Sequence, residues 1–203
     1  MKLSEVIKEM PYLHAGKMPP HVSLNSYSLK TIQREFSLLT SITMNGRQLN
    51  VLLRNDHTAV IGIFDDQDMT DRFNIEFRLL FKPQHELNHV PPEIANCSIM
   101  QVDKVTASTP TIDQGLASTV YEQLASIGHA VVSDNTHFDP GAALWKKLAQ
   151  VPSNRVIVAD VDTGTFKDAT GQTIQYNGSN IPDASIWTNG SDYSGQYRVL
   201  ILY

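Results

Sequence analysis

A predicted helix begins at Gly115-Leu116-Ala117, directly after a polar loop, and this helix start carries the clearest chemical signal in the chain. Its small residues allow a ligand to come close to the backbone. The first amide groups of a helix have no partner inside the helix, and the helix dipole adds partial positive charge there. The sequence therefore predicts that an anion binds at this point.

Polar residues that could catalyse a reaction lie on, or directly after, the two strands predicted on either side of this helix. Ser133, Asp134 and His137 cluster at the end of the second strand, and Asp103 lies on the first. An imidazole can act as a general base near neutral pH, and a carboxylate can also accept a proton. The same residues have ordinary structural uses, because Asp caps turns and polar strand ends are commonly hydrated.

The segment His85-Glu86-Leu87-Asn88-His89 matches the zinc-binding pattern H-E-x-x-H. On a helix this spacing places two imidazoles on one face, with the glutamate as general base. Pro83 and the Pro91-Pro92 pair leave room for only about two helical turns. Pro92 and Ala95 occupy the positions where longer zinc patterns carry a third ligand. We therefore expect a hydrated polar loop and no metal, with zinc hydrolysis as a remote alternative.

The elements that would position these residues are identified by periodicity. They are a strand over 97–106, a helix over 115–127, a strand over 129–134 and a helix over 141–150. Gly128 stands where a glycine usually ends a helix, and Asp139-Pro140 is a typical cap and first turn of the second helix. A strand, a helix and a second strand at this spacing form a βαβ unit, whose two strands are parallel.

The rest of the chain contributes mostly strands. Asn45-Gly46 is a typical two-residue hairpin turn. The further predicted strands cover residues 36–44, 48–54, 59–64, 73–81, 155–161 and 196–203. Residues 1–34 contain several prolines and form an N-terminal arm, with a short amphipathic helix over 1–10. Residues 35–203 form a single α/β (α+β) domain, in which a mixed, mostly antiparallel sheet surrounds the parallel βαβ unit.

Composition excludes several classes of function. The 203 residues carry a net charge of −5, which does not supply the basic face that nucleic acid requires. No apolar run is long enough to span a membrane, and the first ten residues lack the apolar centre of a signal peptide, so we expect a cytoplasmic location. Cys97 is the single cysteine, which excludes an internal disulfide, and we expect it to be a small buried residue on a strand.

The order of the predicted elements resembles that of the GNAT superfamily of acyl-CoA N-acyltransferases over residues 36–203. Residues 112–117 (IDQGLA) are similar to the family's pyrophosphate loop, Arg/Gln-x-x-Gly-x-Gly/Ala. Residues 142–148 (AALWKKL) resemble its helix pattern A-x-x-[LF]-Y-x-[KR]-L. The pairs Ser133-Asp134 and Leu144-Trp145 are similar to pairs in bacteriophage acetyltransferases. For a phage-encoded chain, the expected location is the host cytoplasm or the virion.

The resemblance implies the GNAT fold and direct transfer of an acetyl group from acetyl-CoA to an amine acceptor. The pantetheine arm would lie along the first parallel strand at Val102 and Val105, and Trp145 would be core or would cover the coenzyme. A backbone N–H near residues 102–104 would hold the carbonyl oxygen. The pyrophosphate would bind to the amides of Gln114, Gly115, Leu116 and Ala117.

The chain departs from the family pattern at reactive positions. Ile112 replaces the Arg or Gln of the loop, Gln101 lies near the position of the glutamate base, and Trp145 replaces the tyrosine acid. The substitutes available for catalysis are Asp103, Ser133, Asp134 and His137. These departures define an alternative function, a GNAT-fold protein without catalysis that binds or assembles with a protein partner through residues 1–34, for example in a phage particle.

Overall fold

The computed structural model of the chain describes residues 26–44, 46–66, 72–107, 115–134, 139–187 and 198–203, without the side chains of residues 139 and 140. The predicted helix over residues 1–10 and the residue Asn45 of the predicted hairpin turn lie outside the described residues.

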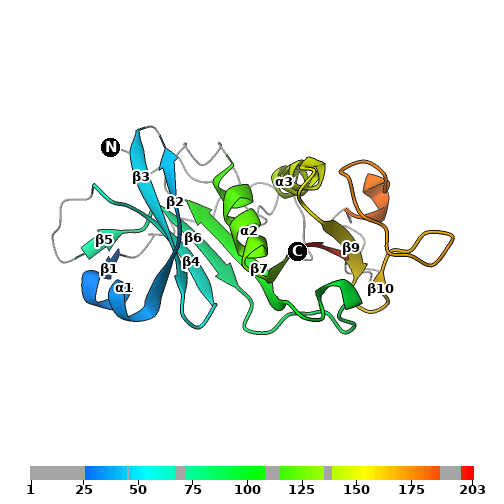
Figure 1. Cartoon of the computed structure of the whole chain (residues 1–203), viewed down its shortest axis with the longest axis horizontal. Coiled ribbons are helices and arrows are strands. Elements are labelled where there is room, and N and C mark those ends of the chain that lie inside the picture. The colour runs from blue at the N-terminus through cyan, green and yellow to red at the C-terminus, as the bar shows by residue number, and fades with distance from the viewer. Residues whose placement is uncertain (1–25, 45, 67–71, 108–114, 135–138, 188–197) are drawn as a thin grey trace, which may run out of the picture.

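Nine strands of the described residues form one sheet in the order β10-β9-β11-β8-β7-β6-β4-β3-β2 (Figure 1). All neighbours in it are antiparallel except β7 and β8, which are parallel. The predicted mixed, mostly antiparallel sheet is thus confirmed. The strands are β2 (Phe36–Met44), β3 (Arg47–Arg54), β4 (Ala59–Phe64), β6 (Phe77–Phe81), β7 (Ser98–Ala107), β8 (His129–Val132), β9 (Val156–Asp160), β10 (Gly164–Thr165) and β11 (Arg198–Leu202).

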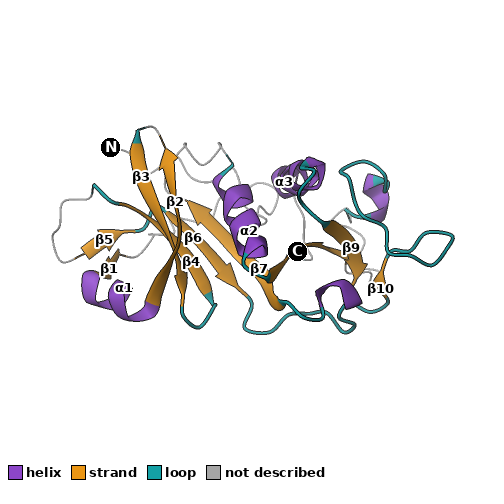
Figure 2. Cartoon of the chain, in the orientation of Figure 1, coloured by secondary structure: helices purple, strands orange, loops and turns teal. Residues whose placement is uncertain are grey.

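The helices within the described residues are few and short (Figure 2). They are α1 (Leu29–Glu35), α2 (Leu116–Ser126), α3 (Asp139–Gln150) and the 3-10 turns η1 (Pro92–Ile94) and η3 (Asp183–Ser185). In this part of the chain, no helix has the length and apolar character needed to cross a membrane. α2 connects β7 to β8, so the predicted βαβ unit is present.

Both faces of the sheet are covered near β8, β9 and β11, which is why these strands are mostly apolar. On one face, Val131 and Val158 pack in a core with residues of α2 and α3. On the other face, Ala130 and Ile157 pack against Leu87 and Ile94, which belong to the connection between β6 and β7. Adjacent residues of one strand therefore enter different cores, as the two-residue period of a strand requires.

Several predicted boundaries are confirmed. β2 and β4 have the predicted limits, and Gly128 follows α2 with a φ of +92°, a conformation that suits glycine. Met44 lies opposite Arg47, which is the register of a two-residue hairpin. α3 begins at Asp139 rather than after an Asp139 cap. The capping role itself falls on a side chain outside the described residues.

The single strand predicted over 73–81 is wrong. This segment forms β5 (Arg72–Asn74) and β6, with a break between them. Phe73 and Ile75 belong to a core cluster with Phe36 and Ile61, whereas Phe77 belongs to the core that contains α2 and α3. The uniform apolar alternation did not reveal the break, because both halves bury apolar residues against different partners.

Residues 26–34, which the sequence analysis assigned to the N-terminal arm, form β1 (Ser26–Ser28) and most of α1. β1 pairs with β5 in a separate two-stranded sheet, and Ile32 of α1 is buried beside Phe36. This part of the arm is therefore packed on the domain.

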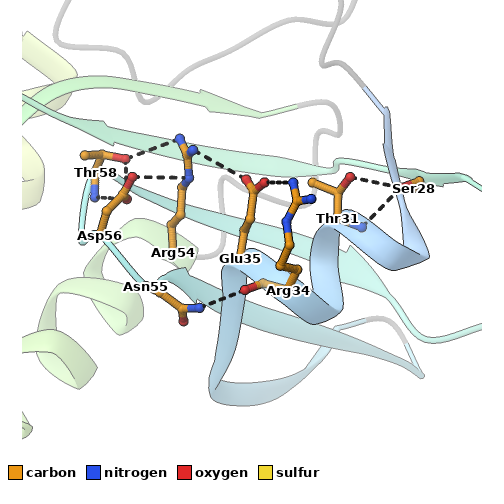
Figure 3. A network of polar contacts seen from close by, with 8 residues as sticks. All are labelled: Ser28, Thr31, Arg34, Glu35, Arg54, Asn55, Asp56 and Thr58. Carbon is orange, nitrogen blue, oxygen red and sulfur yellow. Dashed lines mark hydrogen bonds and ion pairs between the residues drawn. The ribbon is translucent and has the colours of Figure 1, made fainter.

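A network of polar contacts connects α1 to the turn between β3 and β4 (Figure 3). Ser28 accepts a hydrogen bond from the Thr31 amide, at 3.1 Å, and thereby caps α1. At the other end of α1, Glu35 lies 3.4 Å from Arg54, and the Asn55 side chain donates to the Arg34 carbonyl at 3.1 Å. These contacts fix the start of β2 relative to β3.

We expect Ser28→Ala to lower the free energy of unfolding by about 1 kcal/mol, because the amide of Thr31 loses its capping oxygen. Urea unfolding measures the change. Ser26→Ala is the matched control: it removes a hydroxyl two residues earlier and should change stability by less than about 0.5 kcal/mol. Equal losses in the two variants would contradict the capping role.

Candidate functional site at the end of the parallel pairing

β7 and β8 are joined by four residue pairs, from Ser98 opposite His129 to Gln101 opposite Val132. β8 ends at Val132, whereas β7 continues to Ala107 with β6 on its other side. Residues 102–107 therefore extend past the last parallel pair. We call the Gln101–Val132 pair together with residues 102–107 the pairing end.

A β-bulge in β7 lies at the pairing end. Val102 is opposite Phe81 and Lys104 is opposite Leu80, so Asp103 is the additional residue. A bulge bends a strand and increases its twist, and this one lies two residues after the last parallel pair. The Asp103 residue is exposed. Asp103 lies on the first strand of the βαβ unit, as predicted.

The side chains of Val102 and Val105 are each 2% exposed and lie in the core shared with α2 and α3. Their predicted contact with a coenzyme would therefore have to use the backbone of β7. This is compatible with a pantetheine arm, whose amide groups can hydrogen-bond to a strand edge.

α2 begins at Leu116, one residue after the predicted start, and Gly115 is its N-cap residue. Gly115 has a φ of +88°, and the hydroxyl of Ser118 donates to its carbonyl at 2.6 Å. A Cβ atom built on Gly115 would lie 3.0 Å from the Ser118 oxygen and 3.1 Å from the Lys147 Nζ. Glycine is thus favoured here by backbone conformation and by space. Leu116 and Ala117 are buried, so they too offer only their backbone amides.

Lys147 brings a positive charge to this helix start. It is an exposed residue of α3, and its Nζ approaches Gly115 as described above. An ammonium group and the positive end of a helix dipole both favour a bound anion. Lys147 was not predicted as a site residue, because its proximity to Gly115 depends on how α3 packs beside α2.

A polar cluster occupies the other side of the pairing end. Lys82 lies 2.7 Å from Glu86 and 3.0 Å from Asp134. Gln101 accepts a hydrogen bond from the Glu86 amide at 2.7 Å and donates to the Glu86 carboxylate at 3.2 Å. It also donates to the carbonyl of Ser133, at 3.3 Å. Gln101 therefore connects β7, the end of β8 and the connection that follows β6.

The charges in this cluster affect Lys82. Burial would lower the pKa of its ammonium group, but hydrogen bonds and charge from Glu86 and Asp134 outweigh burial and raise the pKa above 10.5. The Lys82 side chain is therefore protonated and positively charged at neutral pH. No local pattern indicates Lys82 as a site residue, because its contact with Asp134 joins residues 52 positions apart.

The predicted catalytic residues Ser133 and Asp134 are buried and make structural contacts. The Ser133 hydroxyl donates to the carbonyl of Asp134 at 2.9 Å and accepts from the Leu200 amide at 2.9 Å. The Asp134 side chain is 2% exposed and faces Lys82. These contacts attach the end of β8 to β11 and to the polar cluster.

Trp145 is 3% exposed and lies in the core beside Tyr121, with ring centroids 5.7 Å apart. The indole thus has the core position that the sequence analysis offered as one of its two roles. Two predicted site residues, Gln114 and His137, lie outside the described residues, as does Ile112.

The H-E-x-x-H segment forms irregular structure, without the helix that would place His85 and His89 on one face. Glu86 of this segment contacts Lys82 and Gln101. Among the described residues, no group of three or more His, Cys, Asp or Glu side chains is arranged to hold a metal ion.

A separate cavity of about 550 Å³ lies between residues 89–93 and the β10 hairpin. Its lining includes His89, Glu93 and Lys167. It contains none of the residues of the pairing end or the α2 start, so it is distinct from the candidate site.

A pair of histidines lies at the opposite end of β8. The rings of His57 and His129 are nearly perpendicular, with centroids 5.0 Å apart. His129 is 7% exposed. Burial and the nearby charge of His57 lower its pKa below 6.5, against the effect of a hydrogen bond to the Ser98 backbone. This contact joins the β3–β4 turn to the start of β8.

Comparison of the chain with protein-family models, with curated proteins and with solved structures found no match.

We expect Lys82→Met to lower the free energy of unfolding by roughly 2–3 kcal/mol, less than for a fully buried pair because Lys82 is 16% exposed. Urea unfolding at neutral pH measures this loss. Because the folded-state pKa of Lys82 is raised, its contribution is complete below pH 10.5 and is lost as the ammonium deprotonates at higher pH. Lys146→Met is the control, since the Lys146–Asp183 pair is more exposed. Lys146→Met should lower the free energy of unfolding much less than Lys82→Met.

The His129 pKa predicts an acid-sensitive contribution to stability. Because the pKa of His129 is lower in the folded chain, the unfolded chain takes up this proton at a higher pH than the folded chain as pH falls. The contribution of His129 to stability is therefore complete above pH 6.5 and is lost as pH falls below it. His129→Phe should flatten the stability profile between about pH 7.5 and 5.5. His89→Gln, on an exposed residue, should leave the profile unchanged. Identical profiles for wild type and His129→Phe would contradict this assignment.

Proposed function

We propose that this protein is a GNAT-type N-acetyltransferase that binds acetyl-CoA at the pairing end and at the start of α2. The observation that carries the proposal is the combination of parallel strands that stop pairing at Gln101 and Val132 with a glycine helix start beside Lys147. The strand order β7-β8-β11-β9 and the element order strand, helix, strand, helix, strand support the same fold family.

Each part of acetyl-CoA would meet a suitable group. The pyrophosphate would accept hydrogen bonds from the amides at Gly115–Ala117 and lie near the Lys147 ammonium. The pantetheine arm would pair with the backbone of residues 102–107, past the end of β8. The bulge at Asp103 would bring a backbone N–H to the thioester carbonyl oxygen, which gains negative charge during transfer.

The reaction is direct transfer: the acceptor amine attacks the thioester carbonyl, a C–N bond forms, and the C–S bond breaks to release CoA. A general base removes a proton from the amine, and the thiolate takes up a proton. Among the described candidates for the general base, Asp103 is the residue with an exposed carboxylate at the pairing end. Ser133 and Asp134 are held by structural contacts, so we assign them to positioning the end of β8.

Calorimetric titration with acetyl-CoA tests the binding site. We expect wild type to bind and Gly115→Ala to lose binding by at least about tenfold, because the new methyl group enters the space beside Ser118 and Lys147 and strains the backbone. Gly128→Ala is the matched control. Its φ of +92° imposes similar strain at the other end of α2, but no atom lies within 4 Å of its added Cβ. Equal affinities in all three proteins, or no binding by wild type, would overturn the proposal.

A second candidate function is a GNAT-type protein without catalysis that serves in an assembly. It is favoured by the structural contacts of Ser133 and Asp134 and by Gln101, whose amide cannot act as a base. Deletion of residues 1–25 tests it while keeping β1 and α1, which pack on the domain. Loss of a stable complex with a co-purifying protein, together with no turnover of acetyl-CoA by the full chain, would favour assembly. A full chain that acetylates amines would exclude it.

A further inference from the structure

The two edges of the nine-stranded sheet differ. β10 at one edge has two residues, whereas β2 at the other has nine, Phe36–Met44. β2 (FSLLTSITM) contains no charged residue and no proline. Edge strands usually carry such residues, or are very short, because their outer N–H and C=O groups can pair with another chain. β10 is protected by its length, and β2 lacks the protection of charge or proline.

The direction of the β2 backbone groups follows from the neighbouring strands. The Asp65 amide donates to the Gln48 carbonyl, so Gln48 of β3 faces β4. In an antiparallel strand, the backbone N–H and C=O groups of successive residues point to opposite neighbouring strands. The backbone groups of Leu49 therefore point to β2, and those of its partner Ile42 point to β3. Ser41 and Thr43 flank Ile42. Their backbone N–H and C=O groups therefore point away from β3, at the outer edge of the sheet.

We propose that this edge binds a second copy of the chain, with the β2 strands of two protomers antiparallel about a two-fold axis at Ile42. Ser41 of each protomer would then pair with Thr43 of the other, so that the outward amides and carbonyls of both residues are satisfied. Ile42 of one protomer would lie opposite Ile42 of its partner in a non-hydrogen-bonded pair.

Charge favours a copy of the chain as the occupant. A two-fold axis brings the same short segment of both chains together, and like charges directly opposite each other destabilise a strand pair. β2 avoids this because it is uncharged throughout. A two-fold contact also closes on itself, whereas an open edge-to-edge contact continues into a fibre.

The structure also limits the strength of the dimer. A bulge between Leu38 and Thr40 interrupts β2, so regular pairing is confined to residues 40–44. Leu38 beside the bulge is 63% exposed and adds apolar surface. A contact of one short strand pair belongs to the small class of interfaces, so we expect a dimer that dissociates on dilution.

Sedimentation equilibrium of the full chain over a range of concentrations tests the proposal. We expect a reversible monomer–dimer equilibrium. Thr43→Pro removes the outward amide and should weaken dimerisation by about tenfold or more, since the symmetric contact loses two hydrogen bonds. Thr43→Val keeps the amide and is the matched control, expected to dimerise like wild type. Urea unfolding of Thr43→Pro should show a folded monomer, because this amide does not pair with β3.

The register is tested by cross-linking. In a Cys97→Ser background, Ile42→Cys should form an intermolecular disulfide under mild oxidation, because opposed residues of such a pair have Cβ atoms about 4.5–5.5 Å apart. Glu122→Cys on α2 should not. A wild-type chain that stays monomeric at high concentration overturns the proposal, as does open-ended aggregation. A chain that dimerises only after deletion of residues 1–25 would assign the edge to its own N-terminal segment and would also overturn it.

Discussion

The limited length of the parallel pairing between β7 and β8 is the constraint on which the rest of the candidate site depends. Four pairs hold the two strands together, and β7 continues past them through a bulge at Asp103. Because parallel strands need a crossover, α2 must return across the sheet, and its first turn follows the segment after β7. The helix start and the free strand edge are thus consequences of a single connection, and the polar cluster adds residues from the connection that follows β6.

Much of the fold was predictable because local patterns dominate it. The apolar run of β4, the alternation in β7 and the helical spacing of α2 each identify one type of element, and glycine ends α2 as expected. The break between β5 and β6 was not predictable from alternation. There the chain moves from one core to another without any change in the apolar pattern, so only the identity of the distant partners distinguishes Ile75 from Phe77.

The site was predictable in outline and not in its side-chain contacts. Gly115 carried a local signal, because a glycine between a polar loop and an amphipathic helix is typical of a helix start. Lys82 and Lys147 carried none, since each acquires its role from a residue far away in the sequence. Glu86 carried a signal for zinc chemistry, which did not indicate its contact with Gln101. Ser133 and Asp134 remain catalytic candidates only by prediction, from their place at the end of a strand. What their position could not reveal is the hydrogen bond from β11 to Ser133 and the ion pair of Asp134 with Lys82.

The position of β11 has a consequence for how the molecule is made. Residues 198–202 lie between β8 and β9, so neither of those strands has its full set of hydrogen bonds until this late segment has been synthesised. The antiparallel strands β2, β3, β4 and β6 need only local connections and can assemble earlier on the ribosome. A nascent chain stalled before residue 198 would leave one edge each of β8 and β9 without a hydrogen-bonded neighbour, and both cores would lack the apolar side chains of β11. Such a chain is a natural substrate for chaperones and for proteolysis.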